Sequence, residues 1–231
     1  MGIFWTMKFK NEKERELLSS WNLETKPLDV RVIVPLGKLN EYKEKNIPID
    51  ETFALNSSEL DIDDWLSTFN LTMTSQEGVL ITKTISKLKD NEKNRSFTIQ
   101  DIQHELAKDP HSSNEIKNLV NSLFQAANSW GVFSKQTDGT SIVDLVKAGK
   151  TTVLDLSVYS SIGSFNVRAL IIGLVSRKLF TSRMDARKRE EMQALQHGTE
   201  YMSYSMTRQL PLTWLFIDEA HEFLPRESKT P

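Results

Sequence analysis

The stretch Leu212-Thr213-Trp214-Leu215-Phe216-Ile217-Asp218-Glu219-Ala220-His221-Glu222 contains an apolar run that ends at two adjacent acids. The run from Trp214 to Ile217 has no polar interruption, which is typical of a strand buried on both faces of a parallel sheet. Asp218 and Glu219 stand where such a strand would leave the sheet, and open α/β folds bind their ligands at that edge. The pattern predicts a parallel α/β sheet with a ligand site at the two acids.

An acid pair in this position is the Walker B pattern of nucleotide hydrolases. The first carboxylate, Asp218, offers Mg²⁺ a hard oxygen ligand, either directly or through water. The second, Glu219, is the candidate catalytic residue because it would polarise the water that attacks the γ-phosphate. Mg²⁺ and ATP are therefore the expected cofactors. The alternative is a surface strand end that carries two ordinary acids.

The composition limits the class of protein. A chain of 231 residues is long enough for one large domain or two small ones. Its formal net charge of −2 gives no overall basic field, so a DNA site would be local or would depend on assembly. The lack of cysteine rules out disulfides and thiolate metal sites and favours a cytoplasmic protein. No stretch reaches the ~18 apolar residues of a membrane span, so no membrane partner is expected.

The chain divides into three predicted parts. Residues 1–56 and 132–231 carry strand and helix signals and predict two parts of one α/β core, with a short helix at 11–21, strands at 29–34, 141–146 and 152–156, and a long helix capped by Ser164. Residues 57–131 instead show hydroxyl-then-acid capping signals that begin at Thr74, Thr98 and Ser112. Apolar residues at helical spacing follow them, which predicts an inserted all-α bundle of four helices. Both ends look cut from a larger domain, and we interpret the chain as a fragment.

One glycine-containing loop imitates a phosphate-binding loop. Gly149-Lys150-Thr151 resembles the end of a P-loop, but Asp144 occupies the position of its first glycine. A P-loop also continues directly into a helix, whereas the β-branched residues after Lys150 predict a strand. We interpret this loop as a turn before a strand, so the chain has a Walker B pattern without a Walker A partner.

Residues 215–225, which include the acid pair, resemble the Walker B segment of the HerA/FtsK class of hexameric ATPases, in particular its archaeal HerA-like branch. Residues 2–8 and 153–157, together with 166–170 and 177–180, are similar to further stretches of that family. The resemblance implies a RecA-like P-loop NTPase core with an inserted helical bundle. It assigns Asp218 to the Mg²⁺-linked acid and Glu219 to the catalytic glutamate. The family's phosphate loop, sensor and trans-acting arginine segments have no counterpart in the chain.

The family resemblance also implies a function. It predicts an ATP-dependent DNA helicase or translocase, a homo-oligomer in the form of a hexameric ring with double-stranded DNA in its channel. In archaea it implies DNA repair through end processing with a nuclease partner. Without a phosphate loop, this chain is not expected to hydrolyse ATP alone. The alternative is a non-enzymatic interaction or regulatory module built around the helical bundle, and a DEAH-box helicase is disfavoured by the motif spacing.

Two further groups of residues have open interpretations. His221 either couples nucleotide state to a neighbouring element or makes a structural hydrogen bond. The basic residues between Arg183 and Arg189 either contact DNA phosphates or form a solvated helix face diluted by acids. We also expect the isolated chain to expose apolar surface and to associate.

Overall fold

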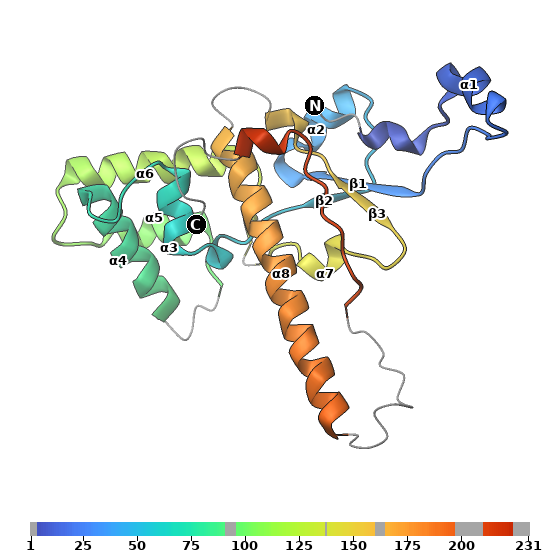
Figure 1. Cartoon of the computed structure of the whole chain (residues 1–231). Coiled ribbons are helices and arrows are strands. Elements are labelled where there is room, and N and C mark those ends of the chain that lie inside the picture. Colours follow the sequence, from blue (N-terminus) through green and yellow to red (C-terminus); the bar gives the residue numbers. More distant parts are fainter. Residues whose placement is uncertain (1–3, 91–95, 137, 160–164, 197–209, 224–231) are drawn as a thin grey trace.

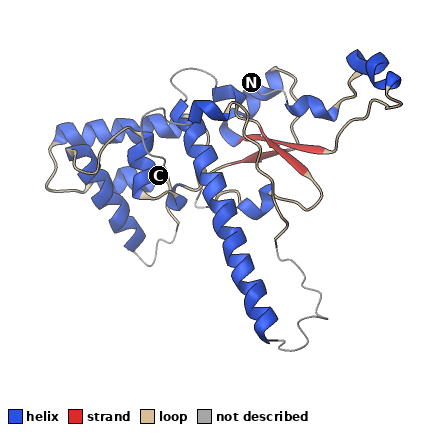
Figure 2. Ribbon diagram, in the orientation of Figure 1, coloured by secondary structure: helices blue, strands red, loops and turns tan. Residues whose placement is uncertain are grey.

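A computed structural model describes residues 4–90, 96–136, 138–159, 165–196 and 210–223. The described part combines helices with one small sheet (Figures 1 and 2). The strands are β1 (Val30–Pro35), β2 (Glu51–Phe53) and β3 (Thr151–Leu154), which pair in parallel in the order β2-β1-β3. An α/β fold with a parallel sheet is thus confirmed, and the finer assignment to a RecA-like core stays a prediction.

The other elements of the described chain are helices and short 3₁₀ turns. They are η1 (Phe4–Lys8), η2 (Glu12–Glu14), α1 (Arg15–Ser20), η3 (Leu36–Lys38), α2 (Leu39–Glu44), η4 (Ser57–Glu59), α3 (Ile62–Thr68), α4 (Gln76–Asp90), α5 (Ile99–Ala107), α6 (Asn114–Ser129), α7 (Ile142–Leu145), η5 (Ser157–Tyr159), α8 (Phe165–Gln196) and η8 (Ala220–Phe223).

The central strand β1 is buried along its whole length. Ile33 aligns with Glu51 of β2 and with Leu154 of β3, so β1 has a strand partner on each side. Alternate residues face opposite ways. Val30, Val32 and Val34 pack with Tyr42 of α2, while Ile33 joins the larger core on the other face. This two-sided burial explains why the β1 sequence is almost entirely β-branched.

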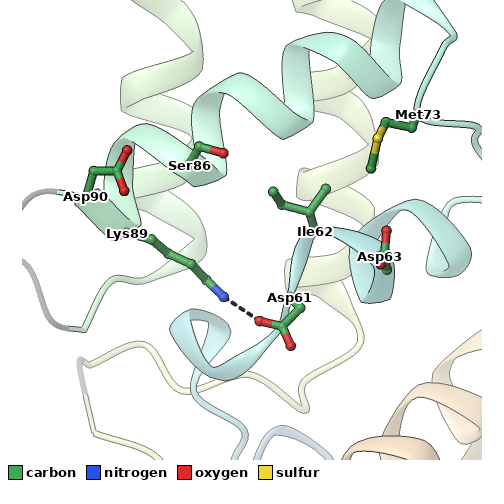
Figure 3. A pocket seen from close by; sticks show the side chains of 7 residues that line it. All are labelled: Asp61, Ile62, Asp63, Met73, Ser86, Lys89 and Asp90. Carbon is green, nitrogen blue, oxygen red and sulfur yellow. Dashed lines mark hydrogen bonds and ion pairs between the residues drawn. The ribbon is translucent and has the colours of Figure 1, made fainter.

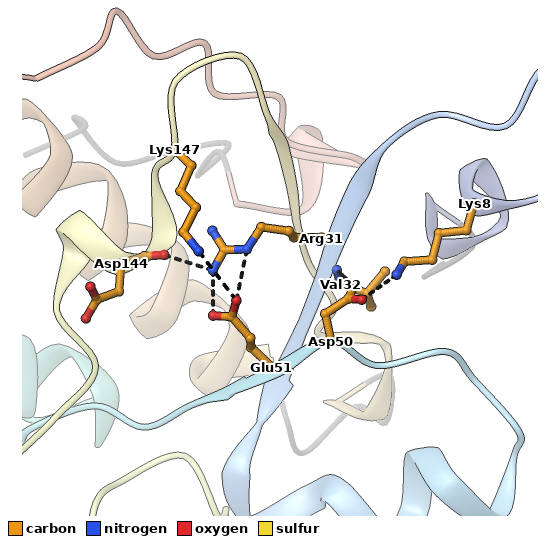
Figure 4. Close-up of polar contacts among 7 residues, drawn as sticks. All are labelled: Lys8, Arg31, Val32, Asp50, Glu51, Asp144 and Lys147. Atoms are coloured by element: carbon orange, nitrogen blue, oxygen red, sulfur yellow. Dashed lines mark hydrogen bonds and ion pairs between the residues drawn. The ribbon is translucent and has the colours of Figure 1, made fainter.

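One arginine interrupts the apolar run of β1 and fastens the strands together (Figure 4). Arg31 is almost fully buried and donates from Nε to Glu51 Oε1 at 3.1 Å and from Nη2 to the carbonyl of Asp144 at 3.0 Å. The hydrogen bonding between Arg31 and the Glu51 carboxylate lowers the pKa of the Glu51 carboxyl. On the other side of the strand, Asp50 accepts from the backbone N–H of Val32 at 2.6 Å and pairs with Lys8 at 2.6 Å.

The prediction of helices within residues 57–131 is confirmed by α3 to α6. The cap at Thr98 has the expected geometry, because its Oγ1 accepts from the N–H of Asp101 while the Asp101 carboxylate accepts from the N–H of Thr98. The other two caps lie one residue later than predicted. Ser75 and Ser113, rather than Thr74 and Ser112, accept the free N–H groups of their helices.

Aromatic side chains fill the centre of this helical unit. Trp65 lies 5.0 Å from Phe124 and 5.3 Å from Phe133 between ring centroids, and the first two side chains are fully buried. Trp65 and Phe124 are therefore core residues and are not available to stack on bases. The same cluster of buried side chains includes Ile33 of β1 and Ile171 of α8, so one core joins the helical unit to the sheet.

The long helix α8 links the two regions. Arg177 makes a bidentate contact with Asp64 of α3 at 2.8 and 2.6 Å, and Lys178 pairs with Glu59. The later turns of α8 extend away from the rest of the described chain (Figure 1). There Arg187 pairs with Glu191 at 2.8 Å, which fits a solvated, charge-balanced helix face. No helix in the described ranges is long and apolar enough to cross a membrane.

Several sequence predictions are wrong in detail. Residues 141–146 contain helix α7 rather than a strand, and the polar stretch 38–56 contains α2 and β2, which the sequence analysis did not predict. Ser164, the predicted cap of α8, lies outside the described residues.

The main correction concerns the apolar run before the acid pair. Residues 212–217 do not form a buried strand: they have no strand assignment, and their large apolar side chains are exposed. A strand is stable when its backbone groups are paired and its apolar faces are covered. Among the described elements β3 pairs only with β1, and no element buries the side chains of this run.

The contact between Gly37 and Gly131, where the sheet meets the helical unit, gives a first test. Gly37 donates to the Gly131 carbonyl at 2.8 Å, and a Cβ on Gly37 would lie 2.5 Å from the Gly131 Cα. Gly37→Ala should lower the free energy of unfolding by about 1–3 kcal/mol through overpacking. Gly173→Ala is the matched control within α8, where a Cβ meets nothing within 4 Å, and it should stabilise the protein by about 0.5–1 kcal/mol. Urea unfolding of the two variants checks this, and equal effects would contradict it.

Candidate functional site

The segment that carries the acid pair begins beside α8. Arg183 of α8 approaches the carbonyl of Leu210 at 3.5 Å. Leu210, Pro211 and Thr213 share a small hollow with Leu179 of α8 and with Val146, which lies just before β3 in the sequence. The carbonyl of Asp144, two residues before Val146, accepts a hydrogen bond from Arg31. Arg31 stands near the start of β1 and pairs in register with Thr152, near the start of β3. The segment therefore starts near the amino-terminal ends of the strands.

The other end of the segment lies at the first turns of α8. The guanidinium of Arg168 stands 5.7 Å from the centroid of the Phe223 ring. In Figure 1, η8, which contains Phe223, lies next to the beginning of α8, and η5 also packs against this helix. Because η5 directly follows β3, this is the carboxyl-terminal side of the sheet. The segment 210–223 thus runs in the same direction as β3 and ends on the side where parallel sheets bind ligands.

The exposed fractions of the side chains alternate along this segment. Leu212, Trp214 and Phe216 are 61, 84 and 88% exposed, whereas Leu215 and Ile217 are 50 and 38% exposed. A period of two is the signature of an extended chain with one face toward the protein and one toward solvent. We call residues 212–217 the apolar strip, with Leu215 and Ile217 on its inner face.

The acid pair follows the strip in a turn. Glu219 has a φ of 52°, in the left-handed region that non-glycine residues seldom occupy. Its carboxylate lies 3.2 Å from Nδ1 of His221, and both side chains are largely exposed. His221 therefore contacts the candidate catalytic residue itself. Asp218 lies in the same turn and is also exposed.

A third acid lies at the same side of the sheet, and the sequence analysis gave it no role. Asp155 directly follows β3 and is only 2% exposed. Its Oδ1 accepts from the N–H of Ser157 at 2.9 Å and from the hydroxyl of Tyr42 at 3.2 Å, while its buried Oδ2 has no hydrogen-bond partner. The signal was present in the sequence, because Asp155, like Asp218, ends an apolar run.

Burial and the nearby charge of Asp155 raise the pKa of the Tyr42 hydroxyl well above the usual range. The single hydrogen of this hydroxyl is shared between Oδ1 and the Asp155 carbonyl, which lies 2.9 Å away, so the tyrosine contacts both the backbone and the side chain of the acid. This contact joins α2 to the end of β3. Asp155 is therefore buried and holds the end of β3 to α2, whereas the side chains of Asp218 and Glu219 are exposed and can contact a ligand.

The donor set suits a magnesium ion better than a larger, fully protein-bound cation. Asp218 and Glu219 supply carboxylate oxygens, and Mg²⁺ commonly takes one or two carboxylates and keeps several waters. Within the described ranges no three or more potential ligand residues gather at one point. An ion held by these two carboxylates would take its remaining ligands from outside the pair.

The loop at Gly149 has the structure expected of a turn. Lys150 donates its N–H to the carbonyl of Lys147, and β3 begins at Thr151. The ammonium of Lys150 pairs with Asp29. This confirms that the loop is a turn before a strand.

A second hollow lies in the helical unit, between α3 and α4 (Figure 3). It has a volume of about 430 Å³, and Lys89 pairs there with Asp61 at 2.7 Å. Asp63 and Asp90 also line it, together with Ile62, Met73 and Ser86. Neither member of the acid pair lines this hollow, so the two sites are separate.

No protein-family model, curated protein or solved structure matches this chain. The resemblance to the HerA/FtsK class therefore stays a prediction that rests on the residues quoted for it.

The alternation along the strip predicts unequal effects of two substitutions. Ile217→Ser should lower the free energy of unfolding by about 1–2 kcal/mol, because Ile217 is the least exposed apolar side chain of the strip, at 38%. Phe216→Ser removes a larger side chain, yet it should change stability by less than about 0.5 kcal/mol because that side chain is already in solvent. Urea denaturation measures both. A larger loss for Phe216→Ser would show that the strip has the opposite orientation.

The raised pKa of Tyr42 predicts a loss of stability in alkali. The unfolded chain releases the hydroxyl proton near pH 10, while the folded protein keeps it, so the stabilisation is complete below about pH 10 and is lost above it. Tyr42→Phe should reduce the steepness of this loss, with Tyr159, whose pKa burial also raises, still contributing. Unfolding free energies measured from pH 8 to 11 test this, and identical slopes would contradict it.

Proposed function

We propose that this chain is part of a Mg²⁺-dependent ATPase that moves double-stranded DNA, with Asp218 and Glu219 in its nucleotide site. The ATPase acts as a homo-oligomer of the HerA type, in DNA end processing and repair. The chain supplies the metal side of the site, and a phosphate-binding loop elsewhere in the intact protein supplies the other side.

The observation that carries this proposal is the course of residues 210–223. The segment runs in the same direction as β3, with one face toward the protein, and its acids follow at the carboxyl-terminal side of the sheet. A nucleotide bound at that edge would meet Asp218 and Glu219 first, because both side chains are exposed there.

Each residue has a separate task in this proposal. Asp218 orients a magnesium-bound water or binds the ion through one oxygen; the ion, when bound, neutralises charge on the phosphates. Glu219 orients the attacking water and accepts its proton. His221, 3.2 Å from the Glu219 carboxylate, fixes the orientation of that side chain.

The interaction-module alternative is favoured by a different observation. The helical unit has a fully packed aromatic core, and it is joined to α8 by ion pairs that do not involve the acid pair. Such a unit can bind a partner without any hydrolysis. The sequence encoded immediately before Met1 separates the two: a strand followed by a glycine-rich loop that ends in Gly-Lys-Ser or Gly-Lys-Thr supports the ATPase, and its absence favours the module.

The direct test is Glu219→Gln in the intact protein. Loss of water positioning and proton acceptance should reduce ATP turnover by about a hundredfold or more, while ATP binding is retained. Glu191→Gln, on the projecting part of α8, is the matched control and should leave turnover unchanged. Steady-state hydrolysis and equilibrium ATP binding are both measured. Unchanged turnover in Glu219→Gln would remove this residue from the site and with it the proposal.

A further inference from the structure

Helix α8 keeps one face open to solvent where the opposite face joins the core. On the core side Ile171 is fully buried and Leu174 is 2% exposed. On the other side a Cβ added to Gly173 would meet no atom within 4 Å. Phe180 and Met184, further along the helix, are 68 and 40% exposed. Among the described residues, therefore, none covers this face.

Five residues share the open face, and none of them is buried. They are Ala169, Gly173, Ser176, Phe180 and Met184, spaced three or four positions apart. At 3.6 residues per turn, all five fall within about 80° of the helix circumference, so they form one continuous stripe. We call them the α8 stripe. Its first three side chains are small and leave a shallow recess, whereas its last two are large and protrude from the helix.

The order of small and large residues makes the α8 stripe complementary to itself in one orientation. If two copies of α8 run antiparallel about a twofold axis between positions 176 and 177, Phe180 of each copy lies opposite Gly173 of the other. Met184 then lies opposite Ala169, because these two residues are also equally far from the axis. Large side chains opposite small ones let two helices interdigitate at close distance. A parallel pair would instead place Phe180 against Phe180 and leave the recess empty.

We propose that α8 pairs with α8 of a second copy of this chain in this antiparallel, twofold contact. A second copy is selected because twofold symmetry requires a surface that complements itself, and both large residues of the α8 stripe find a small residue at the matching height. Charge does not oppose the contact, since Arg177 beside the axis is already paired with Asp64 of its own chain at 2.6 Å.

The proposed contact is small and reversible. The α8 stripe is roughly 22 Å long at 1.5 Å per residue, which places the pair at the low end of interface size. Neighbours in a ring make head-to-tail contacts, whereas this contact is twofold. It is therefore additional to any ring, and it does not rest on the proposed ATPase.

Exchanging a large and a small residue within the full chain tests this proposal. Phe180→Ala should weaken self-association at least about tenfold, because it removes a central aromatic side chain. Gly173→Phe should also weaken it, since two phenylalanines then meet at one height. The double variant with both changes restores a large residue opposite a small one and should associate within about threefold of the parent chain.

Phe216→Ala, on the apolar strip, is the matched control: it removes another exposed phenylalanine and should leave association unchanged. Light scattering over a range of protein concentrations measures association, and circular dichroism confirms that each variant folds. A monomeric parent chain would overturn the proposal, and so would a double variant that associates no better than the single ones.

Because the chain lacks cysteine, single cysteines report the geometry directly. Ser176→Cys lies beside the proposed axis and should give a covalent dimer with a short bismaleimide. Thr181→Cys, about 100° around the helix from Phe180, is the control and should give none. Equal cross-linking of the two variants would contradict the antiparallel contact. These results do not depend on ATP hydrolysis, so they are separate from the test of Glu219.

Discussion

The free outer edge of β3 is the constraint on which the candidate site depends. β1 is paired on both sides and buried throughout, whereas β3 pairs only with β1 among the described strands. A parallel strand with an unpaired edge leaves backbone N–H and C=O groups in need of partners. The apolar strip runs in the same direction as this strand, and its inner face is partly covered. That course sets the side of the sheet on which the acid pair lies.

The contact between Asp155 and Tyr42 holds the chain in place at the carboxyl-terminal end of β3. A carboxylate with one unpartnered oxygen is costly to bury, and the tyrosine hydroxyl and the Ser157 N–H offset part of that cost. This contact connects β3 to α2, and η5 then leads toward α8. Asp218 and Glu219 lie at the same side of the sheet and come from a later part of the sequence.

The sequence predicted the elements whose signal is local. The β-branched run of β1, the cap at Thr98 and the helical spacing of α6 each appear where they were expected, because neighbouring residues decide them. β2 could not be predicted, since it is three residues long and exists only through its pairing with β1. For residues 212–217 the sequence instead predicted a strand that the structure does not contain. Its composition satisfies every local rule for a buried strand, yet burial requires covering elements that the described chain does not supply. Asp218 and Glu219 could be recognised as a candidate site because they follow a long apolar run. Asp155 also follows apolar residues, but its run is shorter and gave a weaker signal.

The central claim is that segment 210–223 meets a nucleotide at the carboxyl-terminal side of the sheet. Amide hydrogen exchange of the intact protein, with and without Mg²⁺ and a non-hydrolysable ATP analogue, measures this most directly. The account predicts slower exchange at residues 217–223 and at the end of β3 when the analogue binds, and no change in α1. Unaltered exchange in segment 210–223 while the analogue is bound would contradict it.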